Sequence, residues 1–430
     1  MRKDNLRKSI IWNTIGSSTL AITSLFYTII LTRLSSLAQV GLYTISFALA
    51  CNTVTLASFG GRTYQVTDTK GEISTFSYIL SRYTTVFFTL FVLIIYLLFK
   101  NYDIYKSVTI LIICIFKYLE ELCDVYYGIM QKNYKLYKVG IFQFVKSLIN
   151  IFIFLIFILL KKNLFVVFIL LFIIDILYFI FIERKYAIKC EKWENKVNKK
   201  ELIKYFSANL FICILTFTTT YIINSPKYKI DLFFTNEIQA VFGIIVMPAT
   251  IMLLIGNFIL NPILVSIADM YNNNKISEIT KIIYKIFGIM VFIGVIGLFG
   301  CYFFGVPLLN FVYSINFNDY KLSLMIIMVG SIFYAITAAI SSILVAMRKI
   351  KSQVVGNLAV ILISFLICGY LVKTYCILGG AIAYTLLIFT RFLIYVIILF
   401  LNLKQRIKRL KWKKYYTLYH LWILVVWKLW

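Results

Sequence analysis

The sequence predicts an all-α integral membrane protein, with twelve transmembrane helices in two six-helix lobes around a central cavity and a C-terminal interfacial helix. Of its 430 residues, 61% are hydrophobic and 14% are charged, which is about half the charged share of a typical soluble domain. The mean hydropathy is +0.89. Apolar runs of about 20 residues, long enough to cross ~30 Å of hydrocarbon, recur between short polar breaks. These observations exclude a water-soluble fold.

The predicted spans follow one another along nearly the whole chain. They cover residues 10–32, 39–60, 83–99, 107–128, 139–160, 164–183, 206–224, 238–262, 283–304, 322–346, 353–372 and 376–401. The first run follows a basic segment but has no small-residue cleavage site, so we expect it to be retained as a span.

The distribution of positive charge predicts the orientation of these spans. With the N-terminus on the cytoplasmic side, the inside segments contain 31 Lys and Arg and the outside loops contain nine. Membrane proteins concentrate such residues on the cytoplasmic side. We therefore expect both termini inside, and the net charge of +27 needs no nucleic-acid partner to explain it.

The longest polar break, residues 184–205, divides the chain into a first lobe, 1–183, and a second lobe, 206–401. An even division with one basic linker is typical of two-lobed transporters. The tail, 402–430, has a basic half that suits an anionic lipid surface. Its last 15 residues or so are rich in Trp and too short to span, which favours an interfacial helix over a partial thirteenth span.

Several kinds of enzyme site are missing from the sequence. The single His and the eight Cys, which form no Cys-x-x-Cys pair, disfavour a metal or a His-centred catalytic site. There is no Walker loop, His-Glu-x-x-His or Gly-x-Ser-x-Gly motif. A membrane-embedded transferase or ligase is the alternative class, but the predicted outside loops are short for an external catalytic domain. We expect a carrier without a cofactor rather than an enzyme.

Ionisable residues inside predicted spans are candidates for function, because each costs at least about 2.5 to 3.5 kcal/mol to insert. Lys117, Glu120, Glu121 and Asp124 are spaced by three and four residues, so they share one face of a helix. They are either functional groups or a local ladder in which Lys117 neutralises Glu120 or Glu121.

Counting 1.5 Å per residue from the cytoplasmic edge gives the depth of each group. Glu121 and Lys146 lie roughly 10 Å in and Asp175 roughly 12 Å in, which predicts that Lys146 pairs with Glu121 or Asp175. Lys117 and Arg391 lie roughly 16 Å in, one in each lobe. Two cations at one depth predict a shared cavity for an anionic, phosphate-bearing substrate. The alternative is that each cation snorkels or pairs within its own lobe.

Two prolines fall in the predicted span 238–262. Pro248 and Pro262 each remove a backbone donor and collide with the preceding turn. We therefore expect them to act as hinges for alternating access.

Three stretches resemble the polysaccharide-biosynthesis (Wzx-type) flippases of the multidrug/oligosaccharidyl-lipid/polysaccharide exporter superfamily. The first, LTRLSSLAQVGLYTISFALA, is similar to the family's Arg-Leu-Leu-Gly-Pro followed by Gly-x-Tyr, and the matching residues are Arg33, Gly41 and Tyr43. The second, EELCDVYYGIMQKNYKLYKVG, is similar to Glu-Ser-x-x-Asp-x-x-Tyr-Gly-x-x-Gln, and the matching residues are Glu120, Asp124, Tyr127, Gly128 and Gln131. The third, around Pro248 and Pro262, resembles the family's eighth helix.

The resemblance implies a flippase in the bacterial cytoplasmic membrane. It would move an undecaprenyl-pyrophosphate-linked oligosaccharide from the inner to the outer leaflet by alternating access, for capsule, O-antigen or other surface polysaccharide. Glycosyltransferases and a polymerase of that pathway are the implied partners. A peptidoglycan-precursor flippase and a small-molecule efflux transporter of the same superfamily are the alternatives.

This reading assigns roles to the charged candidates. Lys117, Arg391, Arg33 and Lys146 are expected to bind the substrate. Glu120, Glu121, Asp124 and Asp175 are candidates for H⁺ or Na⁺ coupling or for ion pairs. The membrane potential could drive export without a coupling ion, and the sequence leaves this choice open.

Overall fold

The computed structural model describes the backbone of residues 3–68, 70–260, 267, 270–271, 273 and 276–429, and the side chains of 7–68, 70–252, 267, 270–271, 273 and 277–406. Every regular element in this part of the chain is helical. The all-α prediction is therefore confirmed for the described residues. Pro262, one of the two predicted hinges, lies outside them.

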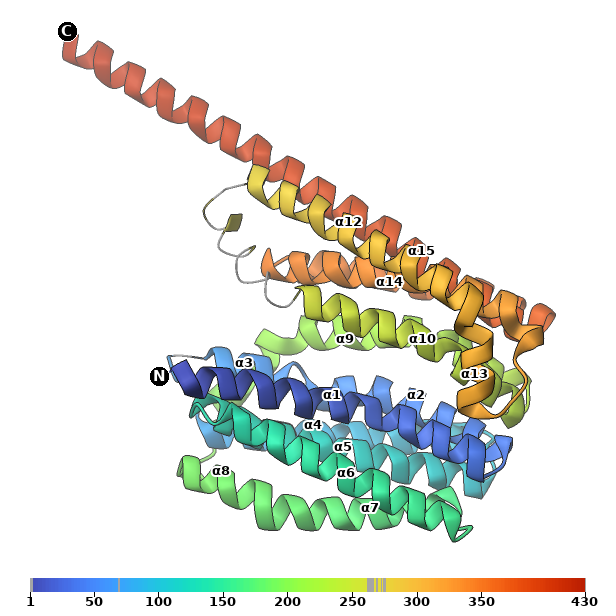
Figure 1. Cartoon of the computed structure of the whole chain (residues 1–430). Helices are drawn as coiled ribbons and strands as arrows, with labels where there is room; N and C mark the ends of the chain where they lie inside the picture. The colour runs from blue at the N-terminus through green and yellow to red at the C-terminus, as the bar shows by residue number, and fades with distance from the viewer. Residues whose placement is uncertain are drawn as a thin grey trace.

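The first half of the chain forms one bundle of helices (Figure 1). Its elements are α1 (Lys3–Leu34), α2 (Leu37–Ser58), α3 (Gly61–Thr67), α4 (Thr75–Phe99), α5 (Ile104–Lys132), α6 (Leu136–Leu159), α7 (Leu164–Tyr178), the π-helical turn η1 (Phe179–Arg184) and α8 (Lys185–Cys190).

The second half forms a second bundle, which lies beside the first and diverges from it toward the side where the N-terminus lies (Figure 1). Its elements are α9 (Lys199–Phe233), α10 (Asn236–Leu260), α12 (Ile276–Gly300), the π-helical turn η2 (Cys301–Gly305), α13 (Val306–Tyr313), the short 3₁₀ turn η3 (Asn318–Tyr320), α14 (Lys321–Ala346) and α15 (Ile350–Leu429).

α15 contains the end of the chain. Its helical backbone breaks at Cys376, where φ is 50° and ψ is −122°. It then continues to Leu429, well beyond the body of the molecule (Figure 1). The helix predicted for the tail is thus present, while its interfacial position stays a prediction.

Nine helical stretches of the described residues are long and apolar enough to cross a membrane, which makes the chain a multi-pass integral membrane protein. α5 is not among them, because every 18-residue window of it contains Lys117, Glu120 and Glu121. Residues Ile350–Arg406 count as one of the nine stretches, although they contain the break at Cys376. The described side chains of α10 cover only Asn236–Met252, which is too short to be included in the nine. The predicted number of twelve spans is therefore not confirmed by this criterion.

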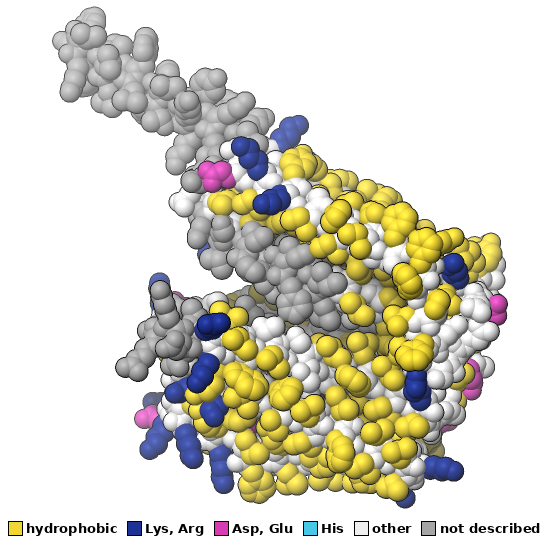
Figure 2. Space-filling view, viewed as in Figure 1, with side chains coloured by type: hydrophobic (Ala, Val, Ile, Leu, Met, Phe, Trp, Pro, Cys, Tyr) yellow, Lys and Arg dark blue, Asp and Glu magenta, His cyan; other side chains and the backbone are white. Residues whose placement is uncertain are grey.

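The surface agrees with a membrane location. Figure 2 shows a broad band of apolar side chains across both halves, with Lys and Arg gathered mostly along the edge nearest the N-terminus. Side chains such as Phe87, Leu98 and Phe311 are more than 70% exposed on it. In lipid, such exposure needs no partner protein to explain it.

Polar residues cap several helices, and each cap marks where its helix begins. Ser36, Ser74, Asp103 and Asn198 each accept a hydrogen bond from a backbone N–H of the first turn of α2, α4, α5 and α9 respectively. Such caps satisfy donors that a helix start leaves unpaired. α4 consequently begins at Thr75, eight residues before the predicted span.

α9 corrects one predicted boundary. The sequence placed a loop after residue 224, but α9 continues to Phe233 with Pro226 inside the helix. A proline cannot donate to the carbonyl four residues earlier, which here belongs to Ile222. The Ser225 hydroxyl donates to that carbonyl at 3.0 Å instead. Lys227, which the sequence placed in an outside loop, therefore lies on a membrane helix.

The two halves approach most closely where α2 and α10 begin. A Cβ atom at Gly41 would lie 1.7 Å from the carbonyl oxygen of Asn236 and 2.5 Å from its carbon. No side chain fits between these backbones.

We therefore predict that Gly41→Ala forces α2 and α10 apart and lowers stability by about 1 to 3 kcal/mol, as overpacking does elsewhere. Thermal unfolding of the purified protein measures the loss. Gly300→Ala is the matched control, because nothing lies within 4 Å of a Cβ atom there. An equal effect of both substitutions would contradict the close approach.

Candidate functional site

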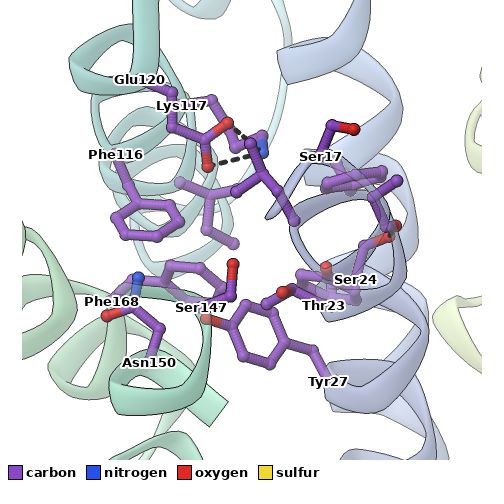
Figure 3. Close-up of a pocket in the computed structure, with 15 residues that line it drawn as sticks. Ser17, Thr23, Ser24, Tyr27, Phe116, Lys117, Glu120, Ser147, Asn150 and Phe168 are labelled. Atoms are coloured by element: carbon purple, nitrogen blue, oxygen red, sulfur yellow. Dashed lines mark hydrogen bonds and ion pairs between the residues drawn. The ribbon is translucent and has the colours of Figure 1, made fainter. Parts of the chain in front are cut away.

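A cavity of about 230 Å³, lined by both apolar and polar side chains, lies inside the first half (Figure 3). Helices α1, α2, α5, α6 and α7 contribute its lining. Figure 3 shows Ser17, Thr23, Ser24 and Tyr27 on one side of the cavity and Ser147 and Asn150 on another. Such hydroxyl and amide groups can bind a polar ligand within an otherwise apolar bundle.

Lys117 and Glu120 provide the charges of this cavity. The Lys117 Nζ atom lies 2.7 Å from a Glu120 carboxylate oxygen, and the two side chains are 19% and 21% exposed. The ammonium group also lies 5.5 Å from the centre of the Phe47 ring. Lys117 therefore forms an ion pair within α5, as one of the two predictions from the sequence had it. Its partner is Glu120 rather than Glu121.

A second cavity, of about 100 Å³, lies between the halves and is lined by α1, α2, α9 and α10. It shares four lining residues with the first: Ala21, Ser24, Tyr43 and Phe47. The two cavities therefore border the same side chains of α1 and α2, one on the side of α5 to α7 and the other on the side of α9 and α10.

Lys227 of α9 lines this second cavity. It is partly buried, and it forms no hydrogen bond or ion pair with any residue that the structure describes. The charges of both Lys117 and Lys227 act on Cys51 of α2, so both cations lie near that helix. Each half thus contributes one cation to one of the two neighbouring cavities.

Arg391 does not occupy the predicted place. Its side chain is 2% exposed. The guanidinium donates to Asn357 Oδ1 at 3.0 Å, to Thr219 Oγ1 at 2.9 Å and to Tyr395 OH at 3.2 Å. These hydrogen-bond partners all belong to α9 and α15, so Arg391 connects helices within the second half. The prediction that Lys117 and Arg391 face one cavity is wrong, because equal depth does not determine which way a side chain points.

Lys146 also has a different partner from either of those predicted. Its Nζ atom lies 3.4 Å from Glu183 Oε1 and 3.6 Å from Cys123 Sγ. The predicted pairing with Glu121 or Asp175 is therefore wrong. Asp175 instead accepts a hydrogen bond from Asn150 at 3.1 Å. Glu183 stood at the predicted end of its span, but η1 continues the helix so that this carboxylate is fully buried.

Glu121 and Asp124 pair with arginines that the sequence assigned to a loop. Arg82 Nη1 lies 2.8 Å from Glu121, and Arg82 Nη2 lies 3.7 Å from Asp124. Arg62 of α3 lies 3.0 Å from the other Asp124 oxygen. These carboxylates are therefore neutralised by α3 and α4.

Arg33 lies at the end of α1 farthest from the N-terminus. Its Nε donates to the Val312 carbonyl at 2.7 Å, and its Nη2 donates to the Phe311 carbonyl. These carbonyls lie in α13, so Arg33 joins the two halves at that end. Lys106 of α5 makes a second connection there, 2.6 Å from Asp231 of α9. Arg33 thus takes part in the contact between the two halves at this end. Its substrate-binding role stays a prediction.

Lys227, Arg82 and Asp231 are among the charged residues that sequence reasoning placed in loops and that the structure places, buried or partly buried, on membrane helices. For Arg82, the Ser74 cap was the available signal that α4 begins early. For Lys227, the clue was weaker, because a proline usually ends a helix. Pro248 lies inside α10, and its hinge role stays a prediction.

Comparison with known proteins agrees with this architecture. No protein-family model matches the chain. The chain is 24% identical over 374 residues to the capsular polysaccharide biosynthesis protein CapF of Staphylococcus aureus, which covers 85% of this chain and 92% of that protein.

Two solved structures of transporters share its fold. The lipid II flippase MurJ, in an inward closed conformation, superposes with a TM-score of 0.66 at 16% identity, over 90% of this chain and 87% of that one. An inward-facing multidrug resistance MATE family transporter of the MOP superfamily gives a TM-score of 0.62 at 11% identity, over 94% and 99%. The chain therefore has the fold of MOP superfamily transporters.

Proposed function

We propose that this protein is a flippase that moves a lipid-linked oligosaccharide with a pyrophosphate group, of the undecaprenyl type, from the inner to the outer leaflet of the cytoplasmic membrane. The two predicted lobes, 1–183 and 206–401, would rock about these neighbouring cavities with both termini inside. The observation that carries this proposal is the pair of cations that the two halves contribute to the cavities, Lys117 and Lys227, the latter without a partner among the described residues.

An anion suits these cavities for electrostatic reasons. Lys117 is balanced by Glu120, while Lys227 adds a positive charge with no partner among the described residues. A buried charge is costly unless it is paired, so the cavity between the halves gains from an anionic ligand. The hydroxyl and aromatic groups around it, including Tyr43 and Phe47, suit the faces of sugars.

The lipid tail would stay in the bilayer while the headgroup passes between the halves. Pyrophosphate and sugars cannot cross hydrocarbon unassisted. Because the inside of the membrane is negative, outward movement of two negative charges gains roughly 4 to 5 kcal/mol per 100 mV. The membrane potential alone would then favour export.

Similarity to CapF supports surface polysaccharide as the destination of the cargo. A peptidoglycan-precursor flippase is the second candidate, favoured by the fold shared with MurJ. Efflux of cationic drugs is disfavoured, because Lys227 would repel a cation.

Deletion of the gene tests these choices. We expect loss of surface polysaccharide and accumulation of its lipid-linked precursor on the inner leaflet, with normal growth of the cell wall. Arrest of peptidoglycan synthesis would favour the second candidate. Increased drug sensitivity with intact surface polysaccharide would overturn the proposal.

A further inference from the structure

A second polar cluster lies in the first half, behind the wall of the larger cavity. Lys146 of α6, Asp175 of α7 and Glu183 of η1 are 3%, 1% and 0% exposed. Lys146 pairs with Glu183 at 3.4 Å. Asn150, which accompanies Asp175, also lines the cavity. The cluster is thus one hydrogen bond away from the cavity.

The charges of this cluster do not balance. It contains two carboxyl groups and one ammonium group. The other acidic groups in the interior of this half have basic partners, since Glu120 pairs with Lys117, and Glu121 and Asp124 pair with Arg82 and Arg62. One negative charge therefore remains without a counter-charge, and its burial is expensive.

Glu183 is the carboxylate that pairs with the single ammonium group of the cluster. Its Oε1 atom accepts a hydrogen bond from Tyr127 OH at 2.5 Å and faces the Lys146 ammonium. Both partners are donors, and both favour a negative oxygen. The uncompensated charge consequently falls on Asp175.

Buried oxygen atoms on both side chains of the Asp175–Asn150 pair have no hydrogen-bond partner among the described residues, and Glu183 Oε2 is a third such atom in the cluster. Asn150 Nδ2 donates to Asp175 Oδ2 at 3.1 Å, but Asp175 Oδ1 and Asn150 Oδ1 both lack a donor. Both side chains are nine-tenths or more buried. Unpaired buried oxygens of this kind are rare and costly. A proton on Asp175 Oδ1 would supply the missing donor, because a carboxylic acid and an amide can form two hydrogen bonds side by side.

We propose that Asp175 is a proton-binding site, in which its carboxyl group carries one proton on Oδ1 and donates it to Asn150 Oδ1. The O–H bond forms with a proton taken from the cavity that Asn150 lines, and it breaks by returning the proton there. One proton then removes the excess charge and pairs both oxygens. This site goes beyond the proposed function, because it exists whatever substrate the protein carries.

The other ionisable groups around Asp175 are consistent with this assignment. Lys146 favours its ionised form, whereas Glu120 and Glu183 oppose it. Three further ionisable groups interact electrostatically with Asp175, and none of them is a cation: Tyr27 of α1, Tyr178 of α7 and Cys123 of α5. The single ammonium near Asp175 already faces Glu183.

Infrared difference spectroscopy of the full-length protein in lipid bilayers, recorded between acidic and alkaline buffer, tests the proposal. We expect a carbonyl band of a protonated buried carboxyl group that disappears in Asp175→Asn. Asn150→Ala should shift that band, because its hydrogen-bond acceptor is lost. Glu120→Gln is the matched control and should keep the band unchanged.

Three outcomes would overturn the proposal. The band could persist in Asp175→Asn, and its loss in Glu183→Gln would then assign it to Glu183. It could be absent in potassium buffer and in sodium buffer alike. It could also appear only when Na⁺ is withdrawn, which would show that sodium displaces the proton and balances the charge whenever it is present. None of these readings depends on transport, so they are separate from the deletion experiment.

Discussion

Lys227→Ala is expected to reduce export of the lipid-linked substrate by roughly 10- to 100-fold, since a charge-assisted hydrogen bond contributes about 1.5 to 3 kcal/mol. Lys227 faces the cavity between the halves and has no counter-charge among the described residues. Its loss should therefore weaken substrate binding without leaving a carboxylate unpaired. The measurement is surface polysaccharide per cell, normalised to the amount of protein in the membrane.

Lys229→Ala is the matched control for this experiment. It removes the same side chain from the same helix two residues later, but Lys229 lines a different pocket, with Tyr96 and Phe365. We expect Lys229→Ala to export normally. Equal losses in both variants would point to a general effect of charge on α9 rather than to a binding site.

Lys117 needs a double variant, because Lys117→Ala alone leaves Glu120 buried without its partner. Lys117→Gln with Glu120→Gln removes both charges and keeps hydrogen-bonding groups in the cavity. If Lys117 binds the phosphates, this double variant should also lose export. Normal export in both the double variant and Lys227→Ala would remove the two lysines from the mechanism.

Arg82→Ala is expected to destabilise the first half by about 3 to 5 kcal/mol, the usual cost of removing one partner of a buried ion pair. Arg82 is 2% exposed, contacts Glu121 and Asp124, and also donates to the Ala57 carbonyl at 3.2 Å. Its removal leaves the Glu121 carboxylate without its close cation. Denaturant unfolding of the purified protein in micelles measures the change.

Arg62→Ala is the control, since Arg62 also pairs with Asp124 but is 23% exposed. Its loss should cost no more than about 1 kcal/mol, as for other accessible pairs. Arg82→Met combined with Glu121→Gln should recover much of the stability, because the unpaired charge is then gone. Failure of the double variant to recover would show that Arg82 acts by packing rather than by charge.

Several features of the molecule follow from the sequence alone. The lipid-facing surface follows from apolar runs, because only helices satisfy their own backbone hydrogen bonds in hydrocarbon. A pair of Lys117 with Glu120 or Glu121 was one of the two predictions from their spacings of three and four residues, because such neighbours meet on one helix. The structure shows the pair with Glu120. The motifs around Arg33 and Glu120 pointed to the superfamily whose fold the structure shows.

Only the tertiary structure decided which charges meet across helices. The residue count along a span gives the depth of Lys146 and Arg391, but it gives neither the rotation of the helix nor its neighbours. Lys146 therefore met Glu183 rather than Glu121 or Asp175, and Arg391 turned into the second half toward Asn357. Lys227 entered the cavity because Ser225 took over the carbonyl that Pro226 could not bond, so that the helix continued where the sequence predicted a loop.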